Sequence, residues 1–180
     1  TYVPDNNFEQ ALIDLEYDDT LDDFVLTENI SGVTSLVVEF KEISDLTGIE
    51  DFTALTNLRC YDNELTSLDV SSNTALDELW VASNQLTSID LSNNASLELL
   101  SIDDNQLTSL DVSNNTALII QLWCSSNQLV HLNMRNGITD QLTDFNATDN
   151  SLTCIETLDP SWATENWTFE NGNVDEGVVF

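Results

Sequence analysis

Basic residues are almost absent from this chain of 180 residues. Lys41, Arg59 and Arg135 stand against 33 acidic residues, and the formal net charge is -30. Nucleic acids and anionic membranes bind proteins through basic patches that release counterions, so neither is an expected partner. An acidic excess of this size is typical of a solvated, salt-tolerant surface, and calcium binding is the alternative explanation.

Long apolar runs and common catalytic signatures are also missing. No stretch of 18 apolar residues occurs, so we expect no membrane insertion. His131 is the only histidine, and no nucleophile elbow, phosphate loop or HExxH motif is present, so we do not expect an enzyme. The chain begins at Thr1 without a methionine or a signal peptide, which suggests a processed polypeptide.

Cysteines number only three, and their spacings fit neither a zinc site nor a redox pair. Cys60 and Cys124 fall three repeats apart in the pattern described below, or roughly 14 Å, which is too far for a disulfide. We expect both to be reduced and buried, and Cys154 to be free in an outward position.

A repeat of about 21 residues fills the middle of the chain. LDELWVASNQLTSIDLSNNAS, from Leu76 to Ser96, is nearly rewritten on either side of itself. Leucines at fixed offsets, with an asparagine after the first half, indicate a leucine-rich repeat solenoid. The six repeats, within residues 33–155, begin at Val33, Leu55, Leu76, Leu97, Leu118 and Leu142.

Each repeat predicts a strand with one buried face in its first half. The second half alternates as well and has no room for a helix, so its convex side should be extended or turn-like. We therefore expect a mostly β, right-handed, curved coil with a parallel sheet on its concave face. A ladder of buried asparagines should satisfy the backbone where each strand turns, at Asn63, Asn84, Asn105, Asn127 and Asn150.

The two ends lack the repeat and should act as caps, because a terminal repeat has no neighbour on one side. Residues 1–32 predict a short helix that begins with a capping box formed by Asn6 and Glu9. Its buried face should carry Phe8, Ala11, Leu12 and Leu15. Residues 156–180 should seal the other end with Trp162 and Trp167.

The motif LxxLxLxxNxLxxLDLxxN, from Leu76 to Asn94, resembles the nested bacterial leucine-rich repeats of the IRREKO class. The lead-in ISGVTSLVVEFKEISDLTGIEDFTAL is similar to the junction between cap and repeats in internalin-type surface proteins. This resemblance implies a chain that is secreted or displayed on a bacterial cell surface, and that binds rather than catalyses. It implies no particular ligand.

The outward strand positions hold the candidate binding residues. Aromatic side chains beside carboxylates on an exposed strand face commonly mark a recognition surface. The candidates are Arg59, Tyr61, Glu78, Trp80, Asp103 and Trp123.

This surface could bind a protein partner or a neutral glycan. Trp80 and Trp123 are expected about 10 Å apart, which suits two sugar rings along one chain. Alternatively, the tryptophans only pack along the sheet, and the chain is a structural spacer. We expect a monomeric module.

A second column of like charges follows the second half of the repeats, at Asp69, Asp90 and Asp111. Stacked carboxylates repel unless each is hydrogen-bonded or shared with a cation. Local bonds to backbone amides are one explanation and calcium is the other. No other cofactor is expected.

Overall fold

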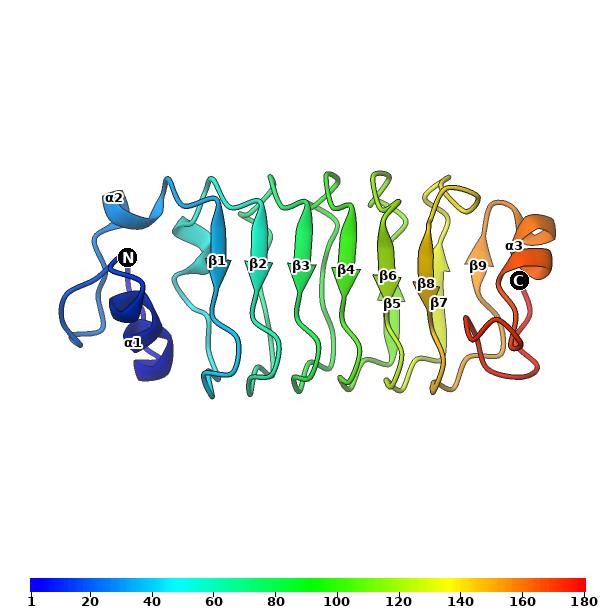
Figure 1. Ribbon diagram of the computed structural model, residues 1–180, viewed down its shortest axis with the longest axis horizontal. Coiled ribbons are helices and arrows are strands. Elements are labelled where there is room, and N and C mark those ends of the chain that lie inside the picture. The colour runs from blue at the N-terminus through cyan, green and yellow to red at the C-terminus, as the bar shows by residue number, and fades with distance from the viewer.

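The computed structural model describes residues 1–180 and shows a solenoid of about six turns. A six-stranded parallel sheet runs in the order β1-β2-β3-β4-β6-β8, and Figure 1 shows these strands side by side along the long axis of the molecule. Its strands are β1 (Ser35–Val37), β2 (Asn57–Arg59), β3 (Glu78–Trp80), β4 (Leu99–Ser101), β6 (Gln121–Trp123) and β8 (Asp144–Asn146). The predicted leucine-rich repeat fold is therefore confirmed.

The register of this sheet follows the repeat without a slip. The central residue of each strand pairs with the equivalent residue of the next, and all six point into the core with at most 3% of their surface exposed. These residues are Leu36, Leu58, Leu79, Leu100, Leu122 and Phe145. The extra residue of the fifth repeat precedes β6 and leaves Ile119 and Ile120 exposed, so it does not disturb the pairing.

A second, three-stranded parallel sheet lies on the other side of the coil, in the order β5-β7-β9. It consists of β5 (Ser109–Asp111), β7 (His131–Met134) and β9 (Glu156–Thr157). In Figure 1, β5 and β7 lie behind β6 and β8. At the equivalent positions of the earlier repeats the chain forms no strand, and in the first repeat a short 3-10 helix, Ile49–Asp51, follows them.

Asparagines bond successive turns of the coil to one another. The Asn84 amide donates to the carbonyls of Cys60, Val81 and Ala82, each at 3.1 Å, and its Oδ1 accepts from the Leu65 amide at 3.0 Å. Asn63, Asn105, Asn127 and Asn150 make the equivalent bonds. One buried side chain thus satisfies backbone groups of two neighbouring repeats.

A second column of buried asparagines was not anticipated, although three of its members close the runs LDVSSN, IDLSNN and LDVSNN. Asn73, Asn94 and Asn115 are completely buried, and Asn136 is 6% exposed. Each of the first three donates two hydrogen bonds to carbonyls of the preceding repeat, as Asn94 does to Val70 and Asn73 at 3.1 and 3.0 Å. The convex side is therefore also bonded from turn to turn.

The N-terminal cap contains α1 (Asn6–Asp14) and α2 (Thr27–Ile30). The predicted capping box is wrong: Asp5 is the N-cap residue and accepts from the amides of Asn7 and Phe8. Glu9 is instead buried and accepts from the amides of Asp22 and Phe24, which follow the helix.

Apolar packing and hydrogen bonds attach α1 to the first repeat. Phe8, Ala11 and Leu12 are buried as expected, whereas Leu15 is 38% exposed because it lies at the C-terminal end of the helix. The second carboxylate oxygen of Asp5 accepts from the amides of Ser44 and Asp45. One aspartate therefore both starts the helix and attaches it to the first repeat.

The C-terminal segment takes the place of a seventh repeat. In the interior, the amides of Asp62 and Asn63 donate to carbonyls of the next repeat. In the last repeat, the amides of Asp149 and Asn150 donate instead to the Asp175 carboxylate, both at 2.9 Å. The end of the solenoid is thus hydrogen-bonded by a side chain, while α3 (Pro160–Asn166) and Trp167 cover its apolar side.

Candidate functional site

The candidate residues lie on the outward face of the six-stranded sheet, which we call the strand face. Pairing places Arg59 beside Trp80, Trp80 beside Ser101, and Ser101 beside Trp123. Glu78 begins β3, and Tyr61 and Asp103 each follow a strand by two residues. All six candidates therefore share one face, but their contacts divide them into three groups.

Arg59, Glu78 and Trp80 form the first group. The Arg59 guanidinium carbon lies 5.4 Å from the centre of the Trp80 ring, within the range of a cation–π contact. The same guanidinium lies 3.7 Å from Glu78, and the Trp80 indole nitrogen donates to Glu78 at 3.2 Å. Asn57 donates to this carboxylate as well. Glu78 thus holds Arg59 and Trp80 against one another.

Tyr61 belongs to a second group, together with a residue that was not anticipated. Phe40 packs edge-on against Tyr61, with the ring centres 5.2 Å apart, and is 65% exposed. Its backbone is left-handed, with φ 56°, at a position that the later repeats fill with aspartate or serine. A bulky residue rarely adopts this conformation. Hydrogen bonding to Glu39 raises the pKa of Tyr61.

Trp123 and Asp103 make up the third group, which contains no cation. Trp123 is partly buried, and the residues around it are well covered although they point outward from the sheet. Leu99 is 7% exposed, Ser101 3% and Gln121 8%. The Gln121 amide nitrogen has no hydrogen-bond partner.

Asp103 lies two residues beyond Ser101, whose hydroxyl donates to its carboxylate at 3.4 Å. Burial raises the pKa of Asp103 above its usual 3.8, and the neighbouring Asp104 adds to the rise. The folded protein therefore binds this proton more tightly than the unfolded chain does. Ionisation of Asp103 opposes folding, and its cost appears as the pH rises above about 4.

Asp103→Asn is expected to stabilise the protein at pH 7 and to leave its stability unchanged at pH 3. The gain should stay below about 1 kcal/mol, because solvent screens a partly exposed carboxylate. Denaturant midpoints at the two pH values measure it. Asp144→Asn, which removes the same charge from an exposed position of β8, is the control. An equal gain in both variants would mean that Asp103 contributes only to the general charge repulsion.

The aspartate column is bonded to its own backbone. Asp69, Asp90 and Asp111 each accept from the amide two residues later, at 2.8 to 2.9 Å. Hydrogen bonds from Ser71, Ser92 and Ser113 hold the pKa of these three carboxyls below the usual range. No group of three or more histidine, cysteine or acidic side chains is arranged to hold a metal ion.

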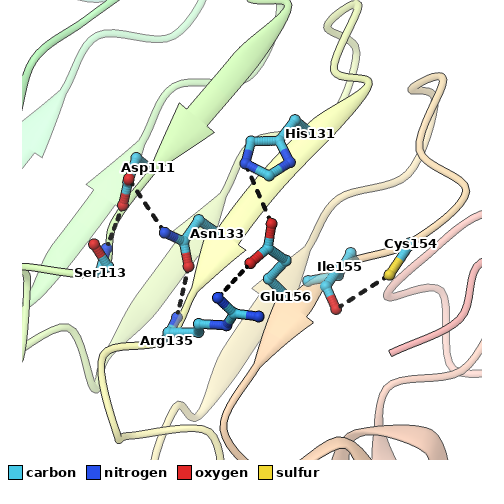
Figure 2. Close-up of polar contacts among 8 residues, drawn as sticks. All are labelled: Asp111, Ser113, His131, Asn133, Arg135, Cys154, Ile155 and Glu156. Carbon is cyan, nitrogen blue, oxygen red and sulfur yellow. Dashed lines mark hydrogen bonds and ion pairs between the residues drawn. The ribbon is translucent and has the colours of Figure 1, made fainter.

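Figure 2 shows the polar side chains of the three-stranded sheet. Glu156 lies 2.9 Å from Arg135 and 3.5 Å from His131, and Asn133 donates to Asp111 at 3.2 Å. His131 is exposed and contacts a carboxylate rather than a hydroxyl or thiol nucleophile. This cluster joins neighbouring strands by their side chains.

The three cysteines are all free thiols. Cys60 and Cys124 are fully buried, and burial raises the pKa of Cys60 to about 12. Burial also raises the pKa of Cys124, with a further contribution from the charge of Asp103. Cys154 is exposed.

None of the cavities on this molecule opens on the strand face. The four cavities are lined by residues of the caps and of the second halves of the repeats, and one of them lies in the C-terminal cap around Trp167, Val174 and Phe180. A site for a small molecule is usually a concave pocket that buries most of its ligand. The strand face therefore suits a broad, shallow contact.

No protein-family model matches the chain. Among curated proteins, internalin J of Listeria monocytogenes serotype 4b (strain F2365) is 38% identical over 76 residues, which cover 41% of this chain and 8% of that protein. Among solved structures, the functional domain of internalin J, which includes a cysteine ladder, is 25% identical with a TM-score of 0.56; the match covers 85% of this chain and 50% of that one.

The fold is also shared with an internalin, inlF, from L. monocytogenes strain 4b F2365. Its TM-score is 0.70 at 20% identity, over 87% of this chain and 51% of that one. This chain thus spans about half the length of the solved internalins and a small part of the curated relative. None of its helices is long and apolar enough to cross a membrane. The chain therefore has the leucine-rich repeat fold, and in sequence and fold it is similar to listerial internalins.

Proposed function

We propose that the chain is a non-enzymatic recognition module that binds a protein partner on its strand face, outside a bacterial cell. The observation that carries this proposal is the clustering of aromatic and charged side chains on a cavity-free sheet surface. Tryptophan, tyrosine and arginine dominate the binding energy of protein interfaces. Phe40, Arg59, Tyr61, Trp80 and Trp123 lie on this one face.

A protein partner is favoured over a glycan by the state of Trp80. Sugar recognition through two tryptophans needs both rings free for stacking. Arg59 already lies over one face of the Trp80 ring, and Glu78 accepts its indole hydrogen bond. Of these two rings, only that of Trp123 carries no cation of the chain, so a two-ring sugar platform is the weaker alternative.

The likeness to internalins supports an extracellular role, and the charge supports a basic partner. A surface with a net charge of -30 attracts cationic proteins and increases their association rates at low salt. It repels anionic polysaccharides. If neither a protein partner nor a glycan binds, the chain acts as a structural spacer.

Random dodecapeptides displayed on phage can test the proposal, with a glycan array in parallel. We expect enriched peptides to bind the wild-type chain and to lose at least about tenfold in affinity with Trp80→Ala combined with Trp123→Ala. The control combines Thr66→Ala with Thr87→Ala, two exposed positions in the second halves of their repeats, and should bind as wild type.

Two outcomes would contradict the proposal. Selected peptides that bind the double tryptophan variant unchanged would place recognition elsewhere on the surface. A glycan signal lost in that variant, without any peptide enrichment, would establish the sugar alternative. Melting curves of both double variants show whether the substitutions preserve the fold.

A further inference from the structure

A tryptophan occupies the same strand position twice on the strand face, once beside a cation and a carboxylate of the neighbouring positions and once with both replaced by neutral residues. In the first copy, Arg59 of β2 lies over Trp80 of β3 and contacts Glu78. Arginine suits this arrangement, because its planar guanidinium stacks on an indole while its N–H groups reach a carboxylate. The protein thus contains its own example of an arginine bound to this surface.

The second copy lies around Trp123. Ser101 of β4 pairs with Trp123 of β6 in the register in which Arg59 pairs with Trp80. A serine side chain is too short to reach over an indole. Gln121 takes the position of Glu78, so the carboxylate of the first copy is replaced here by a neutral amide.

No other cation of the chain reaches Trp123. Lys41 pairs with Asp14 at 3.2 Å, Arg59 with Glu78 at 3.7 Å, and Arg135 with Glu156 at 2.9 Å. These three are all the lysine and arginine residues of the sequence. A cation on Trp123 has to come from another molecule.

Asp103 provides the negative charge that this copy needs. It lies two residues beyond Ser101, the partner of Trp123, and is therefore the diagonal neighbour of Trp123. Ser101 gives it one long hydrogen bond, and burial without a cation raises its own pKa.

We propose that Trp123 and Asp103 bind an arginine side chain of a protein partner, in the way that Trp80 and Glu78 bind Arg59. The guanidinium stacks on the Trp123 ring and donates to the Asp103 carboxylate. This assignment rests on the proposed function, because it identifies one anchor within the same interface. It also explains why a carboxylate that opposes folding lies beside an aromatic ring with no cation of its own.

N-acetyl-arginine amide is the probe for this site, with N-acetyl-citrulline amide as the neutral control of the same shape. In nitrogen-15 spectra of the full chain, the Trp123 indole N–H and the amides of Ser101 and Asp103 should shift saturably with the arginine compound. The Trp80 indole signal should not move, because Arg59 covers that ring. Citrulline should bind at least about threefold more weakly.

Two variants separate the contributions. Asp103→Asn should weaken arginine binding about threefold to tenfold while leaving the fold intact. Arg59→Ala should uncover the Trp80 ring, so that the Trp80 indole signal also shifts with the arginine compound. Because Arg59 is partly exposed, this variant is expected to fold.

Unmoved Trp123 signals, or an equal response to citrulline, would overturn the assignment. If peptides still depend on Trp80 and Trp123 while arginine does not bind, only this inference fails and the recognition function stands. If arginine binds at Trp123 while no peptide does, the site exists and the proposed protein partner fails.

Discussion

Asn84→Ala is expected to lower the free energy of unfolding by about 2–3 kcal/mol. The substitution removes the partner of the Leu65 amide and the donor shared by the carbonyls of Cys60, Val81 and Ala82. The buried Leu65 amide is then left without a partner, which costs about 1–3 kcal/mol unless water reaches it. The three carbonyls lose one donor each but keep another, from Asn63, Asn105 and the Asp62 amide. Denaturant unfolding measures the loss.

Gln85→Ala is the matched control, because Gln85 follows Asn84 directly but is exposed. Its cost should lie within about 0.5 kcal/mol. Hydrogen exchange adds a local readout: in Asn84→Ala the Leu65 amide should exchange faster than amides two repeats away. A loss below about 1 kcal/mol would show that the ladder is dispensable.

Trp167→Ala is expected to cost about 3–5 kcal/mol, the range of large aromatic truncations in a core. Trp167 is 4% exposed and fills the end of the solenoid. Its ring centre lies 4.4 Å from that of Phe145, 5.6 Å from Trp162 and 6.0 Å from Phe180. Without it, the last repeat loses the apolar cover that the interior repeats obtain from a neighbour.

Trp123→Ala provides the contrast, since this tryptophan lies partly exposed on the strand face. It should cost less than half as much stability as Trp167→Ala. The damage from Trp167→Ala should also be local, with faster hydrogen exchange in β8 than in β1. Equal losses from the two variants would mean that Trp123 is a packing residue rather than a binding residue.

The local spacing of leucines was sufficient to predict the coil itself. Leucines at fixed offsets placed the six strands and their register, because a side chain that points inward in one repeat must lie over its equivalent in the next. The structure differs from the sequence prediction where a residue contacts another repeat or lies outside the repeats. Asp5 is the N-cap in place of Asn6, and Glu9 bonds to a loop that follows the helix.

The C-terminal cap also contains a contact that local spacing could not predict. Its tryptophans could be recognised as apolar cover, but the role of Asp175 could not, because it bonds to residues 25 and 26 positions earlier. The second asparagine column repeats as regularly as the first, and its period was readable. The complete burial of these asparagines could not be predicted, because it depends on how closely the turns of the second halves stack.

By itself, the sequence determined the number of turns, the inward leucines, the strand positions and which side chains share the outward face. Each of these follows from a period, and a period is a local property. Only the tertiary structure decided that Arg59 covers Trp80 while Trp123 has no cation, and that Asp103 is partly desolvated beside it. Such differences arise from side-chain packing between neighbouring repeats, which depends on the size and charge of residues about 20 positions apart.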